Sequence, residues 1–208
     1  MYNKEELTKD MEASYTAARY LEEARRLCIH ARRDAIEEDM FLRRKGLYGK
    51  LQNEMVPIGY FCRHYFKSNP EQVQIALKVG NQSHEATVTD SRADSSGIEY
   101  IEVTSIEDDQ EHKSRTKMSE RINQTHPEPI TISRRLRDFY ELINKAITAK
   151  SSNVAYPPNT ALLMFSHIAY SRDVYLEFEF ENAWYYRPLL DGRFKYAFIL
   201  DRETLFQL

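Results

Sequence analysis

Two short segments carry the strongest structural signal in the sequence: HEATVTD at residues 84–90 and GIEYIEVTSI at residues 97–106. Each is rich in β-branched and aromatic residues, and Ala86 and Val88 alternate with polar neighbours as a half-buried strand requires. The stretch between them, residues 91–97, is polar and is typical of a hairpin loop. We therefore predict two consecutive strands joined by a loop.

The pattern continues on the N-terminal side of this pair. Residues 73–79 alternate with period two and predict a preceding strand. Residues 51–66 predict a helix, in which Pro57 either produces a kink or lies in the first turn. Three strands therefore follow a helix.

On the C-terminal side, residues 133–151 predict a helix with Ser133 as its N-cap. Residues 161–165 form a continuous apolar run that suits a buried central strand, and residues 194–200 and 204–208 predict two more strands. Residues 174–180 alternate like a strand, yet Ser171 and Asp173 favour the start of a helix, so both assignments stay open. A further exposed helix is one interpretation of residues 113–122.

Residues 4–47 have a densely charged helical pattern with a narrow, Ala-rich apolar stripe. We interpret residues 1–47 as an N-terminal helical extension and residues 48–208 as a separate α/β domain. Three roles for the extension remain open: packing on the core with ion pairs along its surface, pairing with a protein partner or a second copy of the chain, and facing DNA.

Composition narrows the class of protein. The chain has 208 residues, of which 42% are hydrophobic and 29% charged, and these ordinary globular values argue against wholesale disorder. Cys28 and Cys62 lack the spacing of a zinc site, which favours free thiols in a reducing compartment. The N-terminus has no apolar leader and no apolar run approaches a membrane span of about 20 residues. We expect a cytoplasmic protein without a membrane partner, and its net charge of −3 argues against a dedicated nucleic-acid packaging protein.

The order of helix, three strands, helix and strand resembles the PD-(D/E)xK, or restriction-endonuclease-like, nuclease superfamily. Residues 84–90 and 98–104 carry the resemblance, because many members and relatives have an acidic residue followed by Ala-x-Val and then Tyr-Ile-Glu-Val-Thr. The resemblance covers roughly residues 54–208. It implies an α/β fold with a mixed central sheet flanked by helices.

The resemblance also implies a metal site. Glu85 and Glu102 would hold Mg²⁺, which polarises a phosphodiester and activates a water molecule. Asp90 is the alternative first acid, and Glu54 would be an additional ligand, as an acidic residue of that helix is in some relatives. Thr104 lies on the same strand face as Glu102, where the family has its catalytic lysine, and it would position the water.

The missing lysine requires another cation. In some members of the superfamily a lysine on the segment after the third strand takes this role, and the matching residues here are Lys113, Arg115 and Lys117, with His112 as a base or phosphate contact. Arginines at the start of a helix attract phosphates. The sequence therefore predicts nucleic-acid contacts at Lys113, Arg134, Arg135 and Arg137, and Trp184, Tyr185 and Tyr186 are aromatic residues that could stack on bases.

Two functions follow from these observations. The first is a metal-dependent phosphodiesterase that acts on nucleic acid through Glu85, Glu102 and Thr104. The second is a catalytically inactive nuclease-fold module that binds partners in a larger assembly. The replacement of lysine by Thr104, the acidic balance of charge and the long N-terminal helix motivate the second interpretation.

Overall fold

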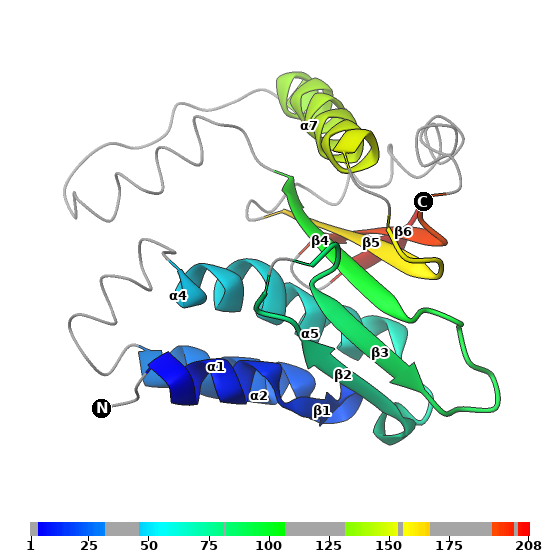
Figure 1. The fold of residues 1–208 in the computed structure, drawn as a ribbon. Coiled ribbons are helices and arrows are strands. Elements are labelled where there is room, and N and C mark those ends of the chain that lie inside the picture. The colour runs from blue at the N-terminus through cyan, green and yellow to red at the C-terminus, as the bar shows by residue number, and fades with distance from the viewer. Residues whose placement is uncertain are drawn as a thin grey trace.

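A seven-stranded mixed sheet forms the centre of the protein in the computed structural model (Figure 1). The structure describes residues 4–31, 46–80, 82–106, 132–153, 156–166, 193–201 and 204–208, with the side chains of 132–138 and 152–153 left out. Its strands are β1 (Ser14–Thr16), β2 (Val73–Leu77), β3 (Ala86–Asp90), β4 (Tyr100–Ile106), β5 (Thr160–Ser166), β6 (Tyr196–Asp201) and β7 (Thr204–Gln207). The strands lie side by side in the order in which they occur in the chain.

The sheet changes direction at β4. Strands β1 to β4 are joined by antiparallel pairing, β4, β5 and β6 run parallel, and β7 is antiparallel to β6. β3 pairs with β4 only through Ala86–Ile101 and Thr87–Tyr100, whereas β4 pairs with β5 along its whole length. The first part of β4 is therefore shared by two neighbours, and its second part leaves β3 (Figure 1).

Helices cover both faces of the sheet (Figure 1). One face carries α1 (Lys4–Glu12), α2 (Ala17–Ala31), α4 (Leu47–Lys50), the π-helical turn η1 (Leu51–Met55) and α5 (Val56–Tyr65), and the chain then reaches β2 through a 3₁₀ turn, η2 (Pro70–Gln72). The other face carries α7 (Ile132–Asn153). The mixed sheet and its helices place the protein in the predicted α/β class.

Each face has its own apolar core. Ile101 and Val103 of β4 pack in the core that contains α2 and α5, while Ile106 belongs to the core that α7 covers. Because successive side chains of a strand point to opposite faces, Glu102 and Thr104 lie on the α7 side of the sheet. All seven residues of β5 are buried, as predicted for a central strand covered on both faces.

The prediction of one unbroken N-terminal helix is wrong. The first helix ends at Glu12, and β1 follows after Ala13, pairing with β2 from Ser14–Ala76 to Thr16–Gln74. The periodicity of apolar residues could not reveal this break, because a strand of three residues is too short to show an alternating pattern. The segment also shares a core with residues beyond 47, since Tyr20, Ala24 and Leu27 of α2 pack with Ile58 and Phe61 of α5. Residues 32–45 lie outside the described residues.

The helix predicted over residues 51–66 is present and begins earlier, at Leu47. Pro57 lies in the first turn of α5, which is one of the two predicted positions. The turn before it is π-helical, and the Val56 N–H donates to the Leu51 carbonyl. Because proline cannot donate to the carbonyl four residues earlier, a widened turn accommodates Pro57 within a continuous helical segment.

The remaining elements follow the prediction closely. The strands at 73–77, 160–166, 196–201 and 204–207 match the predicted runs within two residues, and Cys28 and Cys62 are free thiols. One detail predicted for the helix after β4 is wrong. α7 begins at Ile132, so Ser133 lies inside its first turn and is not its N-cap. The undecided segment 174–180 and the helix considered at 113–122 lie outside the described residues.

The loop between β3 and β4 is fixed by Asp90 at its first end. The carboxylate of Asp90 accepts two hydrogen bonds from the Arg92 guanidinium, at 2.7 and 2.8 Å, and one from the Ser96 N–H at 3.3 Å. Arg92 also donates to the Ser68 carbonyl and lies over the Phe66 ring. Hydrogen bonding to Arg92 lowers the pKa of Asp90 to about 2.

We predict that Asp90→Asn lowers the free energy of unfolding by about 2 kcal/mol, because it removes hydrogen bonds to a charged group. The pKa of Asp90 is lower in the folded protein than its ordinary value of 3.8. Its stabilisation is therefore present above pH 4 and is lost as the pH falls towards 2. Urea unfolding at pH 7 and at pH 3 measures both effects. Asp94 lies in the same loop but is exposed, so Asp94→Asn should change neither the free energy of unfolding nor its dependence on pH. Equal effects from both variants would contradict the role given to Asp90.

Candidate functional site

Glu85 lies immediately before β3, at the place where β3 and β4 begin to pair. Ala86 is the ladder partner of Ile101, and the Glu85 N–H also donates to the Ile101 carbonyl at 2.8 Å. Two residues of one strand thus share one residue of the other, which is the hydrogen bonding of a β-bulge. This arrangement holds Glu85 beside the β4 segment that carries Glu102.

Glu102 is the buried acid of β4. The residue is 4% exposed and lies on the face of the sheet that α7 covers. Lys150, in the last turn of α7, donates a hydrogen bond to the Oε1 atom of Glu102 and forms an ion pair with it. Burial raises the pKa of Glu102, and the contact with Lys150 opposes that rise.

A second acid–lysine pair reaches Glu85 from the helical segment on the other face. Lys50 ends α4 and Glu54 lies in the π-helical turn that follows. The Lys50 Nζ atom lies 3.2 Å from Oε2 of Glu54 and 3.5 Å from Oε2 of Glu85. The side chains of Glu54 and Glu85 are 17% and 19% exposed, so water screens this contact only in part.

Glu54 and Glu85 also hydrogen-bond to each other through their carboxyl groups. Burial, the negative charge of Glu85 and this hydrogen bond together raise the pKa of Glu54 to about 8, although Lys50 acts in the opposite direction. Glu54 is therefore mainly protonated near pH 7. Burial by itself would lower the pKa of Lys50, but its contacts with Glu54 and Glu85 outweigh burial and the pKa is raised.

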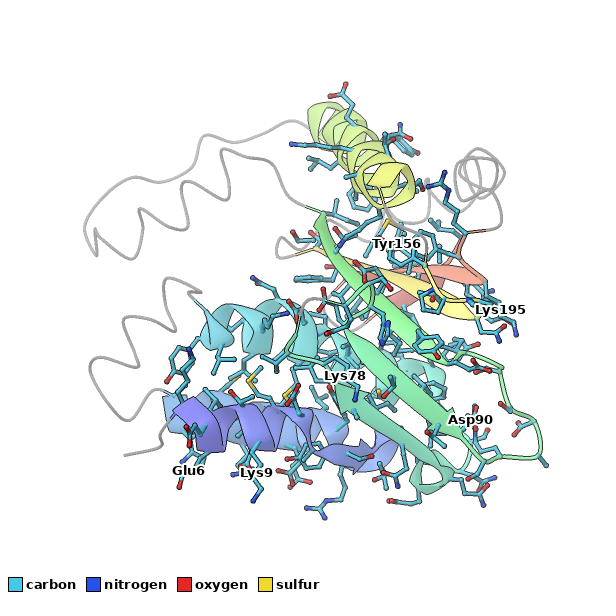
Figure 2. All side chains as sticks on the ribbon, in the orientation of Figure 1. Glu6, Lys9, Lys78, Asp90, Tyr156 and Lys195 are labelled. Carbon is cyan, nitrogen blue, oxygen red and sulfur yellow. The ribbon has the colours of Figure 1, made fainter. Side chains whose placement is uncertain are left out.

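Tyr156 completes the group of side chains that influence one another here. It follows α7 and lies near β5 (Figure 2), with its ring 4.6 Å from that of Phe194. Burial raises the pKa of its hydroxyl to about 12, and the negative charges of Glu102 and Glu85 contribute to that rise. The hydroxyl of Tyr156 is thus a neutral donor close to the carboxylates at neutral pH.

The structure brings together Glu54, Glu85 and Glu102, the three acids predicted from the sequence to take part in the site. Asp90 lies at the opposite end of β3 and is held by Arg92, which fits a structural role (Figure 2). Thr104 is partly buried, two residues beyond Glu102 on the same face. The backbones of Arg134, Arg135 and Arg137 lie near the start of α7.

The two lysines and Tyr156 were missed by sequence reasoning. Lys50 and Glu54 have the four-residue spacing of a helical ion pair, and this signal was available. Lys150 gave no signal, because it is 48 residues from Glu102 in the chain. The cations predicted at Lys113, Arg115 and Lys117, the predicted base His112, and the aromatic residues Trp184, Tyr185 and Tyr186 lie outside the described residues.

The chemistry of the site is that of carboxylate oxygens matched with lysines. Within the described ranges, no group of three or more His, Cys, Asp and Glu side chains has the geometry to hold a metal ion.

None of the helices in the described part of the chain combines the length and apolar character needed to cross a bilayer. Comparison of the chain with protein-family models, with curated proteins and with solved structures finds no match.

We predict that the metal-free protein loses stability as the pH rises from about 5 to 8. Glu54 binds its proton more tightly in the folded protein, with a pKa of about 8 against an ordinary value of 4.5. Its stabilisation is therefore complete below pH 4.5 and is lost as the pH rises through 8. Urea unfolding at pH 5.5, 7.0 and 8.5 measures this slope.

Glu54→Gln should flatten the slope, because glutamine keeps the shape of the protonated acid and does not ionise. The exposed Glu71 provides the matched control, and Glu71→Gln should leave the slope unchanged. A slope that persists undiminished in Glu54→Gln would show that Glu54 does not carry the proton.

Proposed function

We propose that the protein is a metal-dependent phosphodiesterase acting on nucleic acid, with a restriction-endonuclease-like core of the PD-(D/E)xK type. One observation carries this proposal: Glu85 and the buried Glu102 are held side by side where β3 and β4 diverge, and a lysine from α7 contacts Glu102. An incidental surface carboxylate would not be buried at 4% exposure beside a second acid.

Glu85 and Glu102 would hold Mg²⁺. The donor set fits, because Mg²⁺ prefers oxygen ligands and is commonly held by one or two carboxylates together with water and substrate phosphates. Acids whose pKa values are raised by burial and by each other also favour a bound cation, which offsets their charge. When bound, the metal would polarise the phosphodiester and activate water.

Lys150 would take the part of the lysine that Thr104 replaces. A cation is needed beside the developing negative charge of the phosphodiester transition state, and threonine cannot supply one. Lys150 contacts the same carboxylate that begins the Glu-x-Thr sequence, but it comes from α7 and not from β4. Thr104 would then bind a water molecule or a phosphate oxygen by hydrogen bonding.

Nucleic acid would extend from this site along α7. Arg134 lies 16 residues before Lys150, which is a distance of about 24 Å along the helix axis. One strand of B-form nucleic acid advances about 3.4 Å per nucleotide. Arg134, Arg135 and Arg137 would therefore contact backbone phosphates several nucleotides away from the cleaved bond.

We predict Mg²⁺- or Mn²⁺-dependent cleavage of DNA or RNA that Glu85→Gln or Glu102→Gln lowers by about 100-fold, because each removes a metal-binding charge. Labelled single- and double-stranded substrates of both kinds, with and without EDTA, provide the measurement. The control is Glu99→Gln, an exposed acid just before β4. A wild type inactive on all substrates, or variants as active as the wild type, would refute the proposal. Tight nucleic-acid or protein binding without cleavage would instead support an inactive binding module.

We predict that Lys150→Ala also lowers the cleavage rate by about 100-fold, while Lys150→Arg keeps part of it because the cation is retained. Rates at saturating substrate separate this effect from weaker binding. Lys145→Ala, an exposed position on the same helix, should be neutral. Thermal melts identify any loss of stability from leaving Glu102 without its counter-ion; a Lys150→Ala protein that is folded and fully active would exclude Lys150 from the reaction.

A further inference from the structure

Tyr100 is an aromatic residue of the sheet that packs in neither apolar core. It begins β4 and lies two residues before Glu102, so both side chains point to the face of the sheet that carries α7. The residue is only partly buried, and among the described residues the apolar side chains that form or cover the two cores do not include it. A large ring that contacts solvent and has no core to fill is available to a ligand.

A second ring lies against Tyr100 at the candidate site. The ring centroids of His84 and Tyr100 are 4.6 Å apart, and the two rings are tilted by 57°. His84 directly precedes Glu85 in the chain, and Tyr100 precedes Glu102 by two residues, which is about 7 Å along a strand. Each ring therefore lies next to one of the two acids that the proposed function places at the reacting phosphate.

The sheet face beside Tyr100 is polar and lies outside the part that α7 covers (Figure 1). Thr87 of β3 is the ladder partner of Tyr100 and is partly buried, while Thr89 is exposed. Gln74 of β2 pairs with Thr89 on one side and with Thr16 of β1 on the other. These four side chains, which we call the polar face, carry hydroxyl and amide groups rather than charges.

An uncharged face next to charged groups matches the two parts of a nucleotide. Phosphates pair with cations, and Lys50 and Lys150 are held beside the acids. Bases instead stack on aromatic rings and form hydrogen bonds with polar side chains. Because the bases of a duplex are paired and stacked on one another, only a strand with unpaired bases can place a base flat on Tyr100.

We propose that the site takes single-stranded nucleic acid and that Tyr100, with the His84 ring beside it, stacks on the base next to the reacting phosphate. This inference rests on the proposed function, because the acids mark where that phosphate lies. The neighbouring bases follow the polar face across β3 and β2. The substrate class is thus set by a ring on the sheet, and the acids do not choose between a single strand and a duplex.

Binding of short labelled oligonucleotides, measured by fluorescence anisotropy in EDTA, tests the proposal without cleavage. Tyr100→Ala should weaken the binding of a single strand about tenfold, as expected for the loss of one stack between a base and an aromatic ring. Tyr100→Phe keeps the ring and should bind as tightly as the wild type. The same sequence annealed into a duplex should bind the wild type several-fold more weakly than the single strand does.

Tyr60→Ala is the matched control for this measurement. Tyr60 is a partly buried tyrosine of α5, and α5 packs in the core on the opposite face of the sheet. Tyr60→Ala should therefore bind the single strand as the wild type does. Thermal melts of the variants show whether each is folded at the temperature of the binding measurement.

A second measurement uses the wild type and therefore holds even if Tyr100→Ala fails to fold. A single strand that carries 5-iodouracil cross-links under ultraviolet light to an aromatic ring stacked on the modified base. Mass spectrometry of the digested complex should identify Tyr100 or His84 as the attached residue. Attachment only at other residues overturns the proposal.

The outcomes separate this proposal from the proposed function. Binding of single strands that depends on Tyr100 supports the stack, whether or not the protein cleaves them. Equal binding by Tyr100→Ala and Tyr60→Ala, or equal binding of single strand and duplex by the wild type, overturns it even if the wild type cleaves nucleic acid. A wild type that binds no single strand also overturns it, and the cleavage assay then decides the proposed function by itself.

Discussion

A buried carboxylate in the middle of a sheet is the constraint around which the structure is arranged. Glu102 lies on β4 at 4% exposure, and an isolated charge at such a position would cost several kcal/mol. Lys150, which lies in the last turn of α7, forms an ion pair with Glu102 and offsets this cost. The packing of Phe139, Ile143 and Ile147 against β5 and β6 fixes α7 where that lysine reaches the acid.

The convergence of the acids depends on two departures from regular secondary structure. The bulge-like hydrogen bonding of Glu85 to Ile101 sets its carboxyl group next to β4. The π-helical turn before Pro57 carries Glu54 towards Glu85 from the opposite face. Such irregular turns and bulges are common at functional sites, because they aim a side chain where a regular element would not. They hold the acids together.

The charges of the site are close to balanced within the protein itself. Glu54 is mainly protonated near pH 7, Lys50 bridges it to Glu85, and Lys150 contacts Glu102. This balance explains how the fold tolerates three acids at the divergence of β3 and β4. The same balance distinguishes the two lysines, since one lies between two acids and the other supports a single acid from the far face of the sheet.

Local patterns in the sequence specify most of the helices and strands and point to the acids. Alternation in residues 73–106 predicted the first strands, the apolar run at 161–165 predicted the central strand, and the resemblance pointed to Glu54, Glu85 and Glu102, because these signals are carried by neighbouring residues. The break at β1 and the lysines of the site depend on contacts that form only when the chain folds. Ser14–Thr16 pairs with β2, and Lys150 contacts Glu102, so both contacts join residues far apart in the chain. The periodicity of neighbouring residues carries no information about such contacts.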